Sequence, residues 1–286
     1  MRSVPLVVHV LPWVSHGGVE RRRLVLARGL GPEFRQEVVC LGAREPILSE
    51  LEQAGCPVTQ VSPEDGVGAR LDARSLTRAV SIIRTKNPAI VHGAVFEGVT
   101  MAGLAGKGSG ARTVIEETSG PERRSWRGDL LIHLYARMAD RLVAVSPAVT
   151  DYLRRRVHPP RRKLIELING IDTPLTPSTS ELERERERLG LVGHSVVGSI
   201  GRVWDEVKRF SLLIRALPDV LAQGHKVKLL LVGDGPDLER LRGLATELGV
   251  GDSVVTPGYR RDVGTMLGLM DVFALTSRTE SFALVL

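Results

Sequence analysis

Short apolar runs alternate with amphipathic stretches along almost the whole of this 286-residue chain, and that pattern restricts the folds available to it. Short apolar runs are typical of buried strands, whereas apolar residues spaced three and four apart are typical of helices. The first part of the chain predicts strands at residues 6–11, 37–41, 58–61, 89–92, 112–115, 142–145 and 164–168. Helices are predicted between them, at residues 20–30, 46–54, 71–87, 97–105, 127–139 and 147–155. This alternation favours parallel sheets covered by helices on both faces, which is an α/β fold.

The same pattern starts again after residues 169–174. Strands are predicted at 195–200, 227–232, 253–256 and 272–275, with helices at 181–189, 210–223, 236–248 and 262–270. Residues 173–180 are rich in Pro, Thr and Ser, which is typical of a linker. We therefore expect two doubly wound parallel-sheet (Rossmann-like) domains, at residues 1–168 and 181–286, joined by a hinge at 169–180.

The composition excludes several classes of protein. No run of 18 apolar residues is present, as a membrane-spanning helix would need. Residues 1–14 resemble the start of a signal peptide, but Pro5, Pro12 and the lack of a small-residue cleavage site favour a buried first strand. Cys40 and Cys56 are too few for a disulfide framework or a zinc site, so we expect a cytoplasmic protein with reduced thiols.

Basic residues are concentrated in the first half of the chain. The net charge is +6, and the positive excess lies in residues 1–172, in the runs 21–23, 123–127 and 154–163. Such a half attracts phosphates, anionic lipid or nucleic acid. Nucleic acid is the weakest of these partners, because only 4% of the residues are aromatic and no stacking motif interleaves the arginines. We therefore expect no nucleic-acid partner.

Glycine-containing loops follow several of the predicted strands, at the edge where such sheets bind ligands. Gly17 and Gly18 precede a helix, where backbone N–H groups can approach a phosphate or sugar closely; a simple tight turn is the alternative. Gly201 is followed by Arg202 and, at the next helix, by Lys208, two cations that could share one diphosphate. Gly233-Asp234-Gly235-Pro236 lacks the third glycine of a dinucleotide fingerprint, so a nicotinamide dehydrogenase is disfavoured.

Taken in order, these loops resemble those of glycosyltransferase family 4, retaining enzymes of the GT-B fold. The resemblance covers nearly the whole chain and rests on seven motifs: Gly17-Gly18-Val19-Glu20, Val145-Ser146-Pro147-Ala148-Val149, Asn169-Gly170-Ile171-Asp172, Gly201-Arg202 with Lys208, Val232-Gly233-Asp234-Gly235-Pro236, Gly258-Tyr259-Arg260-Arg261-Asp262 and Ser277-Arg278-Thr279-Glu280-Ser281-Phe282. The family implies that the second domain holds a nucleotide-sugar donor and the first an acceptor.

The resemblance also implies roles for individual residues. Arg202 and Lys208 would hold the donor diphosphate and offset the charge of the leaving group, and Glu280 would lie at the donor sugar. His92 is the remaining candidate for a catalytic role, at the family's histidine position after the fourth strand. Further donor-binding residues would be Gly17, Gly18, Gly201, Asp234, Gly235, Tyr259, Arg260, Arg261, Asp262, Ser281 and Phe282.

Two departures from the family pattern affect these expectations. The second acid of the family's Glu, seven residues, Glu motif would fall at position 288, beyond Leu286, so we expect a chain truncated near its C-terminus with an incomplete second domain and little activity. The segment at His92 has one histidine where two often alternate, and Thr118 stands where the family often has histidine.

The leading interpretation is a hexosyltransferase that moves a sugar from a UDP- or GDP-sugar to a hydroxyl with retention. The acceptor would be a cell-envelope glycan or a lipid-linked glycan, as in polysaccharide biosynthesis. The chain contains no Asp-x-Asp pair, which fits a metal-independent reaction without cofactors, in which Arg and Lys offset the phosphate charge. Two alternatives stay open: a sugar-nucleotide epimerase of related fold, and an inactive nucleotide-sugar-binding fragment.

A membrane surface is a further expected partner. Residues 123–138 place Trp126, Leu130, Leu131, Leu134 and Tyr135 near Arg123, Arg124 and Arg127. An amphipathic stretch of this kind can lie on an anionic membrane, which would make the protein peripheral on the inner face; an ordinary helix packed on the sheet is the alternative.

Overall fold

The computed structural model describes residues 4–15, 17–62, 70–118, 125–171, 173 and 175–285. The chain divides into two compact units, residues 1–171 and 172–279. The division falls inside the segment 169–180 that the sequence predicts as a hinge, of which Asp172 and Pro174 lie outside the described residues. The short segment Glu280–Leu284 groups with the first unit, although the sequence-based boundary assigns it to the second domain.

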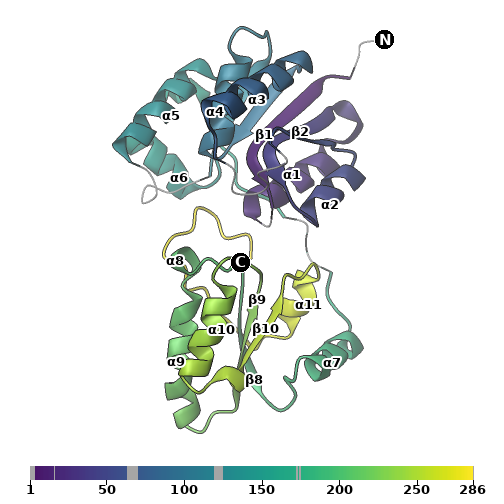
Figure 1. Cartoon of the computed structure of the whole chain (residues 1–286), viewed down its shortest axis with the longest axis vertical. Coiled ribbons are helices and arrows are strands. Elements are labelled where there is room, and N and C mark those ends of the chain that lie inside the picture. Colours follow the sequence, from purple (N-terminus) through teal and green to yellow (C-terminus); the bar gives the residue numbers. More distant parts are fainter. Residues whose placement is uncertain are drawn as a thin grey trace. The chain divides into compact units, whose positions relative to one another are not determined.

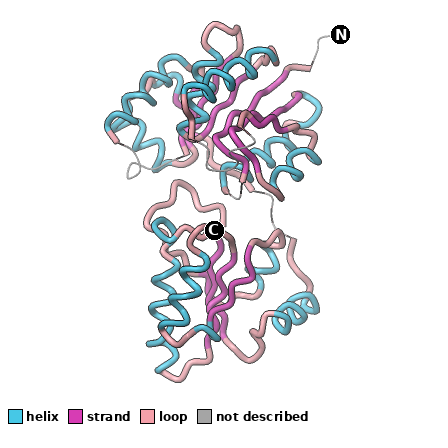
Figure 2. The backbone as a smooth tube through the Cα atoms, in the orientation of Figure 1, coloured by secondary structure: helices cyan, strands magenta, loops and turns pink. Residues whose placement is uncertain are grey.

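The first unit is built on a seven-stranded sheet in the order β3-β2-β1-β4-β5-β6-β7, with every pairing parallel. Its strands are β1 (Leu6–Val14), β2 (Arg35–Ala43), β3 (Val58–Gln60), β4 (Ile90–Ala94), β5 (Arg112–Glu117), β6 (Arg141–Ala144) and β7 (Leu164–Glu166). In the register of β1 with β4, His9 lies beside His92. Figure 2 shows these strands with helices on both sides of them.

Six helices pack on this sheet (Figure 1): α1 (Gly18–Gly29), α2 (Ile47–Gln53), α3 (Ala73–Thr85), α4 (Phe96–Gly106), α5 (Trp126–Met138) and α6 (Pro147–Tyr152). A π-turn, Leu153–Val157, continues α6, and 3-10 turns cover Gly31–Glu33 and Arg161–Lys163. One face of β1 and β2 packs on α3 and α4, and the other packs on α1 and α2. A third core cluster joins β5 and β6 to α5 and α6.

The second unit has a four-stranded parallel sheet in the order β10-β9-β8-β11. Its strands are β8 (Ser195–Ile200), β9 (Val227–Val232), β10 (Val254–Gly258) and β11 (Val272–Phe273), and a 3-10 turn, Gly251–Ser253, precedes β10. The helices are α7 (Thr179–Arg188), α8 (Asp205–Lys208), α9 (Phe210–Ala222), α10 (Leu238–Glu247) and α11 (Val263–Gly268). Helices α9 and α10 cover one face, and α7 and α11 contribute to the core on the other (Figure 1).

The predicted fold class is confirmed: both units are α/β with parallel sheets, and each predicted strand and helix is present with small shifts of its ends. One helix was not predicted. Residues 205–208, read as part of a loop, form the single turn α8, which begins where the backbone oxygen of Trp204 accepts hydrogen bonds from Val207 and Lys208. No helix among the described residues is both long enough and apolar enough to cross a membrane.

Two glycines inside helices test how tightly the units are packed. A Cβ on Gly98, in α4, would lie 2.5 Å from the backbone oxygen of Val10, whereas one on Gly243, in α10, would meet nothing within 4 Å. We expect Gly98→Ala to lower the free energy of unfolding by about 1–3 kcal/mol, because α4 must move away from β1. The matched change Gly243→Ala should raise it by about 0.5–1 kcal/mol through helix propensity. Urea unfolding of both variants tests this, and equal effects would contradict the close packing of α4.

Candidate active site

Each sheet has a point where the strand order reverses, and open parallel sheets bind ligands there, outside the carboxyl ends of the strands. In the first unit this point lies between β1 and β4, and in the second between β8 and β11. Gly17 and Gly18 follow β1, His92 lies on β4, and Gly201, Arg202 and Lys208 follow β8. The candidate residues of each unit therefore lie around its own reversal point.

In the second unit, Gly201 and Lys208 are in close contact. A Cβ on Gly201 would lie 3.3 Å from the Cε atom of Lys208, so the lysine side chain folds over the glycine at the end of β8. The hydroxyl of Thr276, which follows β11, donates to the backbone oxygen of Lys208 at 2.8 Å, and the amide of Arg278 donates to that of Val207 at 2.8 Å. The loop after β11 thus holds the turn that carries Lys208.

Arg202 is exposed, and its guanidinium lies over the ring of Trp204, 5.7 Å from the ring centroid. Across the described part of the chain, this guanidinium has no hydrogen-bond acceptor and no carboxylate partner. The loop backbone is well fixed, because Val203 is buried, donates to the backbone oxygen of Asp234 and accepts from the amide of Asp237. The structure therefore presents a cation on an ordered loop at the carboxyl edge of the sheet.

Two glycines of the loop after β9 allow that loop to lie against the loop after β8. Gly233 has φ = 143°, and a Cβ there would overlap the backbone oxygen of Gly201. A Cβ on Gly235 would overlap the backbone oxygen of Val203. Asp234, between them, accepts a 2.7 Å hydrogen bond from the amide of Gly235. The glycines that resemble half of a dinucleotide fingerprint thus serve the close approach of two loops.

In the loop predicted to bind the base, residues 259–262, an arginine forms ion pairs with two carboxylates, in contrast to Arg202. Arg260 contacts Asp262 at 2.6 Å and Glu185, on α7, at 2.8 Å. The hydrogen bond from Arg260 is the main reason why the pKa of Asp262 is lowered. Tyr259 is half-buried and Arg261 is exposed. The charges of Arg260 and Asp262 are thus satisfied within the second unit.

Glu280, Ser281 and Phe282 lie in the segment that groups with the first unit. Glu280 and Phe282 are exposed, and Ser281 is half-buried. Their contact with a donor sugar stays a prediction.

In the first unit, Gly17 caps the N-terminus of α1 beneath a folded-back glutamate. Glu20 accepts from the amide and the hydroxyl of Ser15, both at 3.3 Å, and a Cβ on Gly17 would lie 2.5 Å from a Glu20 carboxylate oxygen. Gly17 is extended (φ = −162°), a backbone angle that any residue can adopt, and a larger side chain there would displace the Glu20 carboxylate. His16, from the same motif, lies outside the described residues.

A buried ionic cluster lies beneath this loop. Glu116, on β5, is fully buried and contacts Arg23 at 2.8 Å, Arg22 at 3.7 Å and the Nε2 atom of His92 at 3.2 Å. Arg22 also donates to the side-chain oxygen of Asn169, in the predicted hinge. The ring of His9 lies 5.3 Å from that of His92, centroid to centroid. The two histidines, one on each central strand, thus lie beside a charged triad.

The sequence counts Arg21–Arg23 among the basic residues of the first half that attract anionic partners, and that interpretation is wrong for Arg22 and Arg23. Both are buried, and Arg23 is 0% exposed. Arg21 pairs with Glu50 on α2 at 2.9 Å. The sequence did not single out Arg23, Glu116 and His9 as members of one cluster, because the pairing of residues 93 positions apart depends on the sheet order. The one available signal for this cluster was that Arg23 lies on the apolar side of an amphipathic helix, which indicates a buried charge with a partner.

Burial and charge set the protonation states in this cluster. Burial, with Arg23 next in importance, lowers the pKa of His92 to about 4 and that of His9 well below 6.5. Burial alone would raise the pKa of Glu116, but Arg23 and His92 outweigh it and hold that pKa far below its usual range. At neutral pH the cluster therefore contains a carboxylate, two guanidinium groups and two neutral imidazoles.

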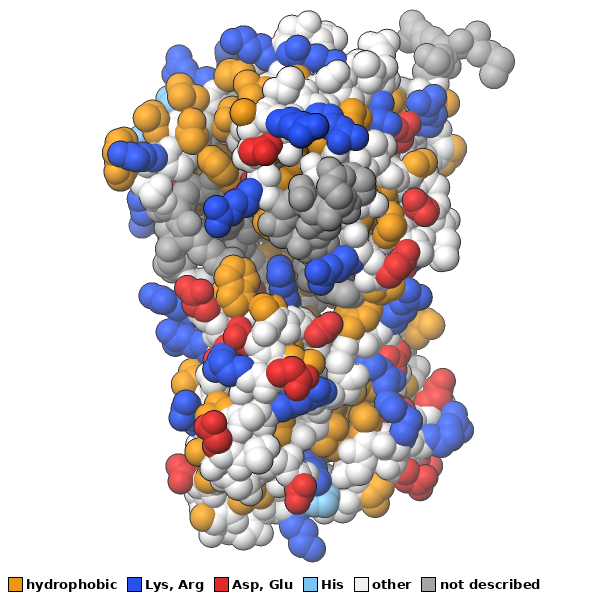
Figure 3. All heavy atoms as spheres, viewed as in Figure 1, with side chains coloured by type: hydrophobic (Ala, Val, Ile, Leu, Met, Phe, Trp, Pro, Cys, Tyr) orange, Lys and Arg blue, Asp and Glu red, His pale blue; other side chains and the backbone are white. Residues whose placement is uncertain are grey.

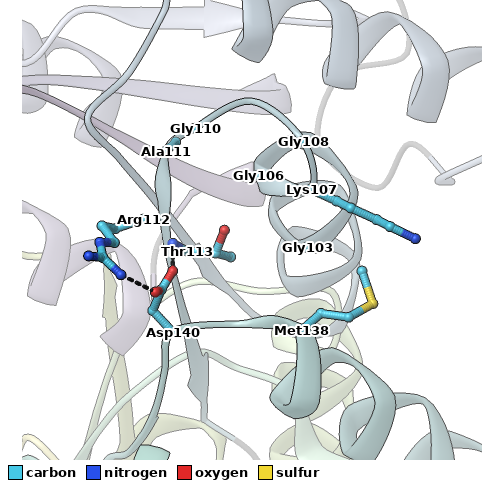
Figure 4. Close-up of a pocket in the computed structure, with 10 residues that line it drawn as sticks. All are labelled: Gly103, Gly106, Lys107, Gly108, Gly110, Ala111, Arg112, Thr113, Met138 and Asp140. Carbon is cyan, nitrogen blue, oxygen red and sulfur yellow. Dashed lines mark hydrogen bonds and ion pairs between the residues drawn. The ribbon is translucent and has the colours of Figure 1, made fainter.

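A cavity of about 510 Å³ lies elsewhere in the first unit, at the amino end of β5 (Figure 4). Two of its charged groups pair with each other: Asp140 accepts from Arg112 at 2.8 Å, and also from the amide of Thr113 at 2.9 Å. Because it opens at the opposite edge of the sheet from the loops above, it is separate from the candidate site. Nowhere in the described ranges do three His, Cys, Asp or Glu side chains form a group that could hold a metal ion.

Two family models together match residues 17–286 of the chain. Residues 17–170 match the family model described as "Glycosyl transferase 4-like domain", and residues 161–286 match "Glycosyl transferases group 1". Over 192 residues the chain is 31% identical to a GDP-mannose-dependent alpha-(1-6)-phosphatidylinositol monomannoside mannosyltransferase of Mycolicibacterium smegmatis. The aligned stretch covers 65% of this chain and 50% of that enzyme.

A second relative is the N-acetyl-alpha-D-glucosaminyl L-malate synthase of Bacillus anthracis, 28% identical over 54% of this chain and 40% of that enzyme. The matched part of the chain thus spans half or less of these two relatives. Among solved structures, Anabaena Alr3699/HepE in complex with UDP-glucose is similar in fold, with a TM-score of 0.82, 22% identity and coverage of 98% of this chain and 76% of that one.

The buried histidines predict a pH-dependent stability. In the folded protein His92 has a pKa of about 4, whereas in the unfolded chain its pKa is 6.5. The folded protein therefore loses stability as the pH falls from 6.5 toward 4, because the unfolded chain binds the proton more readily. We expect the slope to approach about 1.4 kcal/mol per pH unit for each such histidine. His92→Gln should reduce the slope between pH 6.5 and 5, measured by urea unfolding, and the exposed control His225→Gln should not. An unchanged slope in His92→Gln would show that folding does not lower the pKa of His92.

Proposed function

Because this chain belongs to the glycosyltransferase family whose two domain models match residues 17–170 and 161–286, we propose that it transfers a sugar from a nucleotide-sugar donor to a hydroxyl acceptor. The observation that carries the proposal is the pair of cations after β8, with Lys208 folded over Gly201 and Arg202 exposed without a carboxylate partner among the described residues. Two such cations suit a diphosphate, which carries charge on several oxygens at once.

The proposed donor is a UDP- or GDP-hexose bound by the second unit. Arg202 supplies a planar set of N–H donors and Lys208 a compact charge. Gly233 and Gly235 let the loop after β9 lie against the backbone of the loop after β8, and this contact fixes the backbone on both sides of Arg202. In this proposal the loop from Tyr259 to Asp262 lines the base, with Arg260 and Asp262 acting as a fixed wall because they pair with each other.

The proposed reaction proceeds with retention, by attack of the acceptor hydroxyl on the face that the diphosphate leaves. Arg202 and Lys208 offset the negative charge that develops on the leaving group, the part that a metal ion plays in other enzymes. A general base works best with a pKa near the operating pH, and the pKa of His92 is about 4. The low pKa of His92 favours the leaving diphosphate as the group that takes the acceptor proton. In this proposal Glu280 lies at the donor sugar, and the amides of Gly17 and Gly18 face a phosphate or the acceptor.

The proposed acceptor is a cell-envelope glycan or a lipid-linked glycan, presented at the inner face of a membrane. Helix α5 supports this part of the proposal. Its Ile132 and Ala136 are buried against the sheet, yet Trp126 is 67% exposed and Leu130 51%. Arg127 lies 5.3 Å from the Trp126 ring centroid, so a cation accompanies the apolar side chains.

Figure 3 shows hydrophobic and basic side chains together over α5. Leu131, Leu134 and Met138 are exposed on the same helix, so the apolar stripe continues along it. Apolar and basic side chains on one helix suit the interface of an anionic membrane. Of the cations proposed from the sequence for this surface, Arg123 and Arg124 lie outside the described residues.

Titration calorimetry with UDP and with GDP tests the donor site. Arg202→Ala and Lys208→Ala should each weaken binding of the preferred diphosphate by about 1.5–3 kcal/mol, because each removes a charge-assisted contact. Lys226→Ala is the control, since Lys226 is exposed just before β9 at the amino edge of the same sheet. Wild-type affinity in both site variants would refute the proposed donor site. Sugar transfer itself is tested by following an acceptor-dependent release of the diphosphate, with the anomeric configuration of the product read by NMR.

Flotation with vesicles tests the membrane surface. We expect the protein to float with vesicles that contain anionic phosphatidylglycerol and to stay behind with neutral phosphatidylcholine vesicles. Leu130→Glu should reduce flotation several-fold, because it places a negative charge within the apolar stripe of α5. Leu212→Glu is matched to it, since Leu212 is 48% exposed on α9 of the other unit. Equal flotation of the two variants would dismiss α5 as the docking helix.

A further inference from the structure

We propose that Trp204 is a positioning residue that holds Arg202 ready for the donor diphosphate, an inference that rests on the proposed function. The two side chains come from one tight turn, in which the amide of Trp204 donates to the backbone oxygen of Arg202 at 2.8 Å. This turn brings the guanidinium to 5.7 Å from the centroid of the indole ring. Trp204 is 38% exposed, so its ring covers the cation at the surface and does not fill a core.

A cation–π contact leaves the donors of an arginine available. The face of an aromatic ring attracts the charge of the guanidinium but offers no oxygen or nitrogen atom that would accept from its N–H groups. A carboxylate partner does the opposite, as Arg260 shows: Asp262 accepts from its Nε and Nη2 atoms, and Glu185 lies 2.8 Å from its Nη1 atom. Arg202 is therefore held at the ring, and no acceptor among the described residues occupies its N–H groups.

Ordering before binding strengthens binding, because a long side chain that is already fixed loses less conformational freedom when the ligand arrives. Trp204 is itself held by the turn that carries the second cation. Its backbone oxygen accepts from the amides of Val207 at 3.1 Å and of Lys208 at 2.9 Å, which starts α8. Trp204 thus connects the two cations, through its ring to Arg202 and through its backbone to Lys208. The backbone connection would survive a side-chain substitution, so the ring can be tested alone.

The test is a double-mutant cycle on the full chain, with UDP and GDP binding measured by calorimetry. Trp204→Leu should weaken binding of the preferred diphosphate about two- to fivefold, the range expected for one exposed cation–π contact. Trp204→Phe, which keeps an aromatic face, should recover most of that loss. In an Arg202→Ala background, Trp204→Leu should have no further effect, a result that a merely structural role would not produce.

The outcomes separate this inference from the proposed function. A Trp204→Leu loss that persists in the Arg202→Ala background would overturn the positioning role, and so would wild-type affinity in Trp204→Leu together with a loss in Arg202→Ala. If Arg202→Ala and Lys208→Ala both bind with wild-type affinity, the donor site itself is wrong and the positioning role fails with it. Thermal unfolding of each variant provides the folding control, because the exposed ring of Trp204 should change the melting temperature little.

Discussion

Parallel pairing of the strands is the constraint on which the rest of this structure depends. Each strand that pairs with a parallel neighbour must be followed by a crossover, so all the loops that leave the strands of one sheet emerge at the same edge. In the second unit this brings the loops after β8, β9 and β11 together, although they are far apart in sequence. Gly233 and Gly235 then let the loop after β9 approach the backbone of the loop after β8.

Arginine serves three different purposes in this chain, and its surroundings decide which. Arg23 is fully buried beside Glu116, and loss of that carboxylate would leave a buried guanidinium without its ion-pair partner. Arg260 is shared between two carboxylates at the surface, which fixes a loop. Arg202 lies on an aromatic ring and keeps its donors. Of the three, Arg202 is the arginine whose environment suits an arriving anion.

The first unit contains a buried ionic cluster around Glu116. Glu116 lies between α1 and the central strands, and Arg22 extends the same set of contacts to Asn169, where the chain leaves the unit. Helix α1, which begins at the Gly17–Gly18 loop, is therefore held against the sheet by the ion pairs of Arg22 and Arg23 with Glu116. Burial, with Arg23 next in importance, lowers the pKa of His92 to about 4 and so keeps its imidazole neutral at pH 7. A catalytic role for His92 stays a prediction.

Local sequence patterns were sufficient for the fold class, the strands from Leu6 to Val272 and the loops that carry Gly17, Gly201 and Gly233, because apolar periodicity and glycine placement act within a few residues. Tertiary structure alone decided which charges meet. The sequence placed Arg22 and Arg23 in a basic patch, but the strand order buries them against Glu116. It read residues 205–208 as loop, since one turn has no periodicity to detect, and it offered no sign that Trp204 would face Arg202. The ion pairs depend on the positions of whole strands, which are set by packing across the sheet, whereas the contact of Trp204 with Arg202 forms within one tight turn whose shape no local pattern predicts.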